Sequence, residues 1–507
     1  MTLLGKIREI VWGNPAPTKQ ERKLVVKIDC VIMPFICLMY WVNHLDRSNL
    51  TNAYVSGLKE DLGMYGTELN QINSVFYVGY TVSQIPNNII LQKVSPQKYL
   101  SLCILCWSFL TLGLSFVTSW RQIMAIRFFL GLFESATFVG SHYIMGSWYN
   151  THEIGKRTAV FAASGLAGSM FSGFLQGAIY KNLNGVNGRA GWRWLFIIDF
   201  LITIPIAALG YFVFPGHPET IESKFLSLEE RALATERLPE PTIKRGTLGW
   251  SLLRRVLSSW EVYALSLLAL LAGDTEMFAD NSILNLYLKY LGTYSVELIN
   301  YIPTAVFAIA LVSILICSWY ADYFQKSGGR WHVGGFLAST SILSGAIMLK
   351  PPSINAKLFA LFLNGVQIGY RGVLFSWAND TMRNDDAKRA IVIGMMNAIS
   401  ESIRFQIKEC EQSSAGANFF SPIAIAFYIF WTLLFYNTEQ QPMWREGSIA
   451  MIVIGICMYF SVGSVVLLER RQTQKATYVL EGESPPIEAC QDVTNIQTKV
   501  DKEPNSV

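Results

Sequence analysis

The chain has 507 residues, of which 51% are hydrophobic and only 15% carry a charge. A soluble protein of this length needs more charged side chains than that to cover its surface, so the composition excludes an ordinary soluble globular protein. The formal net charge of +4 provides no global basic field, which argues against a nucleic-acid-binding protein.

Apolar runs long enough to cross a bilayer, which takes roughly 20 helical residues, follow one another along the chain. They lie near residues 28–48, 70–92, 98–117, 121–148, 157–180, 193–215, 259–290, 299–321, 332–350, 355–379 and 446–468, with an interrupted run before the last. We therefore predict an all-α integral membrane protein with about twelve transmembrane helices in two six-helix bundles, which is the layout of a secondary transporter.

Polar segments divide the chain into five parts. A basic tail (1–27) precedes the first bundle (28–215), a charged loop (216–258) separates it from the second bundle (259–468), and a polar tail (469–507) follows. Lys and Arg concentrate in the loops on the side of the two tails, so the positive-inside rule predicts cytosolic termini and a cytosolic central loop. We expect the last tail to be disordered because it is polar and contains Pro485 and Pro486.

One stretch does not fit a spanning helix. Residues 388–400 and 423–436 have the pattern of two half-helices, and the segment 401–422 between them contains five charged residues: Glu401, Arg404, Lys408, Glu409 and Glu411. Each charge at the bilayer centre costs roughly 2.5–3.5 kcal/mol. The segment either loops into an aqueous space or is an insertion, even a retained intron. We favour an insertion, because its removal leaves one helix of normal length.

Ionisable residues inside a span are costly and are therefore candidate functional residues. In the fourth span Arg127 and Glu134 are seven residues apart with Gly131 between them, so two helical turns place all three on one face. The planar fork of Arg127 suits a substrate carboxylate, and Glu134 is a candidate proton carrier because a carboxyl removed from water is protonated more readily. The alternative is a structural pair that fixes this helix to its neighbours.

Two more candidate proton carriers lie in other spans. Asp46 lies at the end of the first span next to Arg47 and is either a gate or proton site or part of a solvated helix end. Asp274 in the seventh span is seven residues from Asn281, so the two can share a face, with Asn281 as a candidate substrate contact. Glu276 lies on another face of the same span.

The tenth span contributes polar residues to the expected central cavity. Gln367, Tyr370 and Arg371 are candidate substrate contacts, and Arg371 is a second candidate for binding an anion. The fifth span instead has small residues at intervals of four, Gly165, Ser169, Gly173 and Gly177, which predict closely packed helices that slide past one another.

Nothing in the sequence indicates an enzyme. The five histidines form no His/Asp or Cys/His constellation, and Cys103 and Cys106 lie within an apolar run. We therefore expect no catalytic residue, no metal site and no cofactor.

Several motifs resemble the major facilitator superfamily, in particular its fungal anion:cation symporter branch, the allantoate permease-like family. They are LDRSN at residues 45–49, the Arg127–Gly131–Glu134 pattern, and GWRWLFI at residues 191–197. Residues 51–62, 168–173 and 375–379 are, more narrowly, similar to fungal vitamin transporters, most of all those for pantothenate. The resemblance covers roughly residues 25–468.

The resemblance implies a cavity at the bilayer midplane, alternating access, and a gating pair of Asp322 and Arg330 that clamps cytosolic helix ends. It also implies a monomeric, multi-pass plasma-membrane protein that imports a small organic anion, pantothenate or a related carboxylate vitamin, with a proton. Transport of nicotinate, biotin or allantoate, export of a secondary metabolite, and a nutrient sensor that transports nothing stay open as alternatives.

Overall fold

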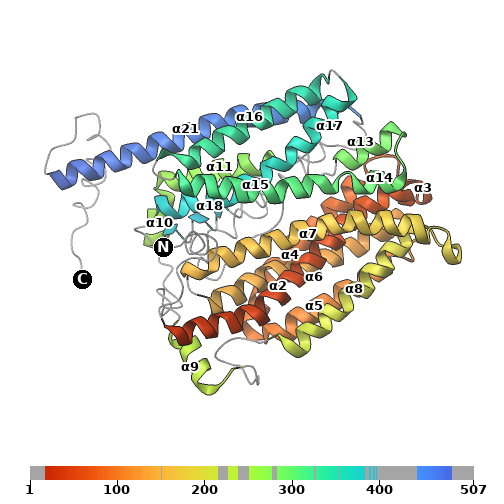
Figure 1. The fold of residues 1–507 in the computed structure, drawn as a ribbon, viewed down its shortest axis with the longest axis horizontal. Helices are drawn as coiled ribbons and strands as arrows, with labels where there is room; N and C mark the ends of the chain where they lie inside the picture. Colours follow the sequence, from red (N-terminus) through yellow and green to blue (C-terminus); the bar gives the residue numbers. More distant parts are fainter. Residues whose placement is uncertain are drawn as a thin grey trace, which may run out of the picture.

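The computed structural model describes residues 18–149, 151–214, 226–237, 250–276, 283–324, 327–351, 353–382 and 442–481, together with 388–389, 392–393 and 395–396. Every regular element within these ranges is a helix (Figure 1). The predicted insertion at 401–422 and the candidate residue Asn281 lie outside the described residues.

The first half is built from long helices that run side by side (Figure 1). They are α2 (Lys19–Ala53), α4 (Glu68–Lys93), α5 (Pro96–Leu114), α6 (Trp120–Trp148), α7 (Thr151–Leu183) and α8 (Gly191–Val213), with the short elements η1 (Tyr54–Leu58), α3 (Lys59–Asp61) and η2 (Val186–Gly188) at one end. Two short helices, α9 (Leu228–Glu236) and α10 (Trp250–Leu257), fall in the central segment.

The second half has a similar arrangement of helices, several of which are shorter. Its helices are α11 (Trp260–Asp274), α13 (Ile283–Leu291), α14 (Val296–Tyr301), α15 (Thr304–Tyr323), α16 (Gly329–Leu349), α17 (Ile354–Leu363), η4 (Asn364–Gly369), α18 (Tyr370–Thr381) and α21 (Arg445–Glu481). In the first half α4 packs on α6 and α5 packs on α8. In the second half α15 packs on η4 and α16 on α21, so the same pairing of spans recurs, as two related bundles require.

Eight helical stretches of the described chain are long and apolar enough to cross a bilayer. They are Lys19–Asp61, Pro96–Leu114, Trp120–His142, Gly191–Phe212, Val296–Ala321, Gly329–Leu349, Ile354–Thr381 and Arg445–Gln472. Large apolar side chains such as Phe212 and Phe460 are more than 70% exposed on the outside of these helices. In a bilayer these side chains face lipid, so the prediction of an all-α membrane protein is confirmed.

The first span is longer at both ends than the sequence pattern predicted. Thr18 and Glu21 form a capping box, in which each side chain accepts a hydrogen bond from the other residue's backbone N–H, so α2 begins at Lys19. The helix continues through Ala53 into η1. Asp46 therefore lies inside a helix and is buried, and its interpretation as part of a solvated helix end was wrong.

The last span also continues beyond its predicted end. α21 runs to Glu481, so the beginning of the tail that we expected to be disordered is helical, and residues 482–507 lie outside the described residues. Two hydrogen bonds hold this extension on the second half. Trp377 donates its indole N–H to Glu469 over 3.1 Å, and Gln472 donates to Glu261 over 3.5 Å.

The contacts that join the two halves lie mainly between α7 and the helices α14 and α15. Further contacts of η1 with α13 and α14 lie at the end of the bundles where η1, α3, α13 and α14 are found, here called the η1 end (Figure 1). Asn300 of α14 donates to Ser56 over 2.9 Å, and Lys289 of α13 pairs with Glu60 over 2.8 Å. On α7, a Cβ at Gly173 would lie 2.6 Å from the backbone oxygen of Asn300, so only glycine permits this approach. The close packing predicted for the small residues of this span is thus confirmed.

Glycine also sets the distance between α4 and α6. A Cβ at Gly131 would lie 2.7 Å from the backbone nitrogen of Tyr80 and would collide with the carbonyl oxygen of Phe76. Because backbone atoms cannot rotate away as side chains can, α4 and α6 must separate to accept any larger residue.

We predict that Gly131→Leu destabilises the protein, whereas Gly463→Leu in α21 does not, since no atom of the described residues lies within 4 Å of a Cβ at Gly463. Overpacking of this kind typically costs about 1–3 kcal/mol. Thermal unfolding of the purified variants in detergent measures the difference, and equal melting temperatures for the two variants would contradict the proposed helix contact.

Candidate functional site

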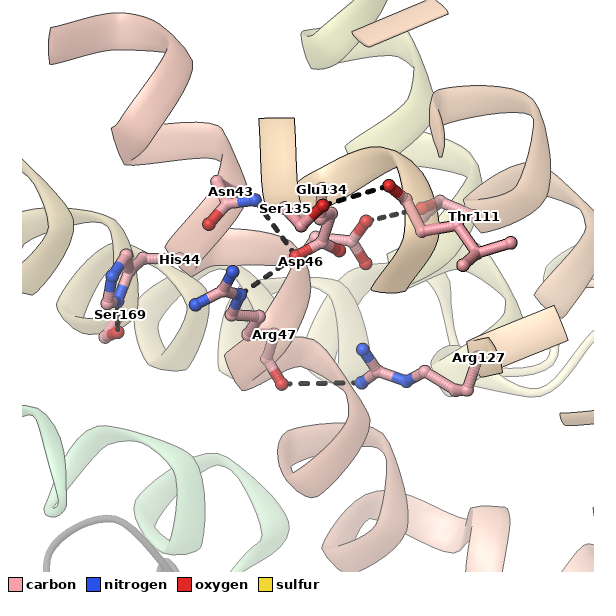
Figure 2. A network of polar contacts seen from close by, with 10 residues as sticks. Asn43, His44, Asp46, Arg47, Thr111, Arg127, Glu134, Ser135 and Ser169 are labelled. Atoms are coloured by element: carbon pink, nitrogen blue, oxygen red, sulfur yellow. Dashed lines mark hydrogen bonds and ion pairs between the residues drawn. The ribbon is translucent and has the colours of Figure 1, made fainter. Parts of the chain in front are cut away.

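Four charged side chains of α2 and α6 lie together in the interior of the first half: Asp46, Arg47, Arg127 and Glu134 (Figure 2). A fifth, Asp199 of α8, is close enough to Asp46 and Glu134 to interact with them electrostatically, and the five are here called the charged cluster. Asp46 and Arg127 are 1% exposed, and Glu134 and Asp199 are fully buried. The side chain of Arg47 retains 10% exposure. Buried charges persist only when they are paired or hydrogen-bonded, so the partners of each decide what the cluster can do.

Arg47 of α2 and Glu134 of α6 form the central ion pair of the cluster (Figure 2). The Nε of Arg47 donates to Oε2 of Glu134 over 2.9 Å, and Asn43 donates its side-chain N–H to the same oxygen over 2.9 Å. The guanidinium also lies 4.9 Å from the ring centre of Tyr80 on α4. The other oxygen of Glu134, Oε1, is buried without a hydrogen-bond partner among the described residues.

Arg127 shares the face of Glu134, as the sequence predicted, but its polar contact is not with that carboxylate. Its Nη2 lies 3.5 Å from the backbone oxygen of Arg47, and its guanidinium lies over the Phe76 ring at 5.3 Å (Figure 2). Its Nε has no hydrogen-bond partner in the described part of the chain. The alternative of a structural pair holds in a changed form, because the arginine that ties α6 to α2 through Glu134 is Arg47.

Asp46 and Asp199 complete the cluster as carboxyls without a cation in contact within the described ranges. Thr111 of α5 donates its hydroxyl to Asp46 over 2.5 Å, and Asn49 of α2 donates its amide to Asp199 of α8 over 2.6 Å. Sequence reasoning missed Asp199. The signal was present, since a single carboxyl interrupts the apolar run of the sixth span, but no motif marks it.

The candidates of the second half are separate from the charged cluster. Arg371 of α18 pairs with the buried Glu276 over 3.6 Å, so Glu276 is the partner of this second candidate anion contact. Asp274 is 2% exposed, and its Oδ1 has no hydrogen-bond partner among the described residues. Gln367 donates to Thr340 of α16 over 2.7 Å, so in this state its amide points into the second half.

Tyr370 was predicted to contact the substrate, and Arg330 was predicted to belong to a gating pair. The hydroxyl of Tyr370 lies against α16, where a Cβ at Gly334 would be 2.8 Å from it, so Tyr370 fills the interior of the second half. Arg330 pairs with Asp380 at the end of α18. The side chain of Asp322 is not among those described, so the Asp322–Arg330 clamp stays a prediction, and Asp380 is an additional partner that the sequence did not indicate.

A pocket lies between the two halves close to the η1 end. Its polar lining consists of neutral side chains from both halves: Ser48 and Asn52 of α2, Ser169 of α7, Asn285 of α13, Asn300 of α14 and Thr304 of α15. Such amides and hydroxyls bind hydroxyl and amide groups of a ligand and carry no net charge. Among the residues that the structure describes, no group of three His, Cys, Asp or Glu side chains is placed to hold a metal ion.

Residues 36–405 match the family model of the Major Facilitator Superfamily. The chain belongs to this superfamily. The chain is 39% identical over 447 residues to the pantothenate transporter FEN2 of Saccharomyces cerevisiae, covering 86% of this chain and 82% of that one. It is 36% identical over 463 residues to the pantothenate transporter liz1 of Schizosaccharomyces pombe, covering 91% and 85%.

A solved structure supports the fold independently. The structure is a bacterial homologue of the human lysosomal transporter Spinster in an inward-facing, occupied conformation, and it superposes with a TM-score of 0.61 at 14% identity over 86% of this chain and 97% of that one. This likeness confirms the major facilitator fold. The family match and the relatives confirm that the chain is a membrane transporter and not an enzyme.

We predict that Arg47→Leu and Glu134→Leu each destabilise the protein by roughly 3–5 kcal/mol, because each leaves one buried charge without its counter-charge. The double variant should cost less than the sum of the two, since it removes both charges together. Thermal unfolding in detergent measures this double-mutant cycle. Arg121→Leu is the control, because Arg121 is exposed on the same helix as Glu134. Strict additivity would mean that the two side chains do not stabilise each other, which would contradict the ion pair.

Proposed function

We propose that this protein imports pantothenate, or a closely related small carboxylate, together with a proton. The observation that carries the proposal is the buried ion pair between Arg47 and Glu134, in which a carboxylate of the protein occupies the place that a substrate carboxylate can take. The two pantothenate transporters of yeasts, at 39% and 36% identity over most of this chain, support the choice of substrate.

The coupling follows from competition for Arg47. When Glu134 is ionised, it holds the guanidinium, and an approaching anion meets a pair that is already neutral. When Glu134 takes a proton, Arg47 loses its counter-charge in a buried place, which is strongly unfavourable unless another anion replaces it. Proton and substrate therefore each favour the binding of the other, and this reciprocal coupling is what symport requires.

The exposure of the two arginines favours Arg47 over Arg127 as the residue that binds the substrate. The side chain of Arg47 is 10% exposed, whereas Arg127 is 1% exposed and lies behind α2 against the backbone oxygen of Arg47. We assign Arg127 a supporting role: its positive charge balances Asp46, which is the second candidate for the proton.

The second half provides the opposite wall of the transport path in this proposal. We assign Asp274 and Arg371 to this wall. Gln367 and Tyr370 support it from the interior of the second half, and Asn281 stays a candidate outside the described residues. The neutral pocket beside the η1 end suits the hydroxyl and amide groups that pantothenate carries in addition to its carboxylate. A flat aromatic acid such as nicotinate has no such groups, which makes it the weaker alternative.

The positive-inside rule places both termini and the segment 216–258 in the cytosol, so the η1 end faces the outside. The contacts at the η1 end then describe a state that is closed to the outside, and transport proceeds by rocking of one bundle (28–215) against the other (259–468). On the cytosolic side, Lys27 of α2 donates to Glu230 of α9 over 2.8 Å and holds the pKa of that carboxyl below its usual range. We place the protein in the plasma membrane as a monomer.

Uptake of labelled pantothenate into yeast that lacks its own carrier tests this proposal. We predict faster uptake at about pH 5 than at about pH 7.5, because binding takes up a proton. Arg47→Gln should lower uptake roughly 10–100-fold at both values, which corresponds to the loss of charge-assisted hydrogen bonds. Arg121→Gln, an exposed change, should leave uptake unaltered.

Glu134→Gln separates binding from coupling. Glutamine is neutral like the protonated carboxyl, so Arg47 stays available to the substrate at every pH. The variant should exchange labelled for unlabelled pantothenate across the membrane at near wild-type rates without concentrating it. Accumulation against a gradient by Glu134→Gln would contradict the role of Glu134, and binding without any exchange by the wild type would favour a nutrient sensor.

A wild-type protein that reaches the cell surface and takes up no pantothenate requires one further variant. Deletion of residues 401–422 removes the segment that we interpret as an insertion. Uptake that appears only after the deletion would retain pantothenate as the substrate, whereas continued absence of uptake would overturn it and direct the search to biotin or allantoate, or to export.

A further inference from the structure

The charged cluster is not electrically balanced. It contains three carboxyls, those of Asp46, Glu134 and Asp199, and two guanidiniums, those of Arg47 and Arg127. With every group ionised, one negative charge would remain uncompensated in a buried region, which is a costly arrangement. While Glu134 is ionised, or while a substrate anion is bound in its place, one of the other two carboxyls therefore has reason to hold a proton.

Asp199 is the carboxyl that is least supported by positive charge. Glu134 contacts Arg47, and Asp46 lies next to Arg47 on α2. Among the described residues, the side-chain hydrogen-bond partners of Asp199 are instead the amide of Asn49 at 2.6 Å and the hydroxyl of Thr203 at 3.4 Å. The charged groups that act on Asp199 are Asp46 of α2 and Glu134 of α6, and both are carboxyls. Within the described residues, α5, α7 and η1 place no charged side chain in contact with Asp199.

A chain of hydrogen bonds connects Asp199 to the other half of the protein. Asn49 donates to Asp199, Ser172 of α7 donates to Asn49 over 2.5 Å, and Asn52 donates to Ser172 over 2.7 Å. The last member is Asn285 of α13, which donates to Asn52 over 3.2 Å across the boundary between the halves. Each donor in this series points toward Asp199.

This common direction makes the chain sensitive to the charge of Asp199. Hydrogen bonds in series polarise one another, and a bond to an ionised acceptor is roughly twice as strong as one to a neutral acceptor. Asp199, Asn49, Ser172 and Asn52 all belong to the first half, so rocking leaves their mutual contacts intact. The bond from Asn285 is the member of this series that crosses between the halves. Rocking that separates the halves at the η1 end would therefore break it.

We propose that Asp199 is a proton-sensitive positioning residue, which favours closure of the η1 end when ionised and opening when protonated, through the Asn49–Ser172–Asn52–Asn285 chain. The proposal rests on the proposed function only for its place in a transport cycle. In that cycle, protonation of Asp199 opens the carrier to the outside when the outer proton concentration is high. Proton-driven import needs this order, in which the proton is taken up from the outside before the substrate is carried inward.

The test measures opening directly and needs no substrate. Spin labels at Tyr65, which follows α3, and Leu298, on α14, report the distance across the η1 end, since both side chains are exposed and lie on different halves. Both labels are attached to introduced cysteines in a background without the eight native cysteines. The distance between the two spin labels is then measured by double electron–electron resonance in lipid nanodiscs without pantothenate.

The ratio of open to closed molecules should rise roughly threefold to tenfold between about pH 7.5 and about pH 5. Protonation of Asp199 weakens the bond from Asn285, and this ratio corresponds to part of the free energy of one hydrogen bond. Asp199→Asn, which stays neutral, should show the low-pH distribution at both values. Ser172→Ala interrupts the series of hydrogen bonds without altering Asp199, and it should abolish most of the pH dependence of the open-to-closed ratio. Ser164→Ala is the control, because Ser164 bonds to the Phe161 carbonyl of its own helix.

A purely structural role predicts a different pattern. Ser172→Ala would then shift the distances equally at both pH values and leave the pH dependence as it is in the wild type, which would overturn the proposal. The same holds if Asp199→Asn retains the wild-type pH response. Because the distances are measured without substrate, a failed pantothenate assignment leaves this result unaffected, and a flat pH response in the wild type would reject the role of Asp199 whatever the substrate is.

Discussion

The interior of a membrane protein has no water to neutralise a charge, so each buried charge must find its counter-charge within the protein. In this transporter that constraint brings α2 and α6 together through Arg47 and Glu134. The contact between α4 and α6, where glycine allows backbone to touch backbone, brings the rings of Phe76 and Tyr80 against the same guanidinium. The fold and the candidate site therefore depend on the same few residues.

A buried pair that must stay neutral can exchange its partners but cannot lose one. The ion pair therefore both stabilises the fold and couples the two ligands, since protonation of Glu134 favours the binding of an anion to Arg47. The imbalance of three carboxyls and two guanidiniums extends the argument to Asp199. Its hydrogen-bond chain reaches the contacts between the halves, so charge inside one bundle can influence the closure of the two.

The sequence predicted the membrane class, the two bundles and the helical face shared by Arg127 and Glu134, because these depend on hydropathy and helical period. It did not predict that Arg47 would pair with Glu134, because a partner from another helix depends on how the helices pack. The alternative of a solvated helix end for Asp46 was wrong because α2 extends through Ala53. Asp199 was missed because a single carboxyl has no spacing to mark it, and the pairing of Arg330 with Asp380 joins segments that are distant in sequence.

The measurement that tests the central claim most directly is the number of protons taken up when pantothenate binds. Calorimetric titration of the purified protein in two buffers with different ionisation enthalpies gives this number. The account predicts that binding takes up a proton in the wild type and none through Glu134 in the Glu134→Gln variant, whose affinity depends less on pH than that of the wild type. Wild-type binding without proton uptake, or unchanged uptake in Glu134→Gln, would contradict competition for Arg47 as the basis of coupling.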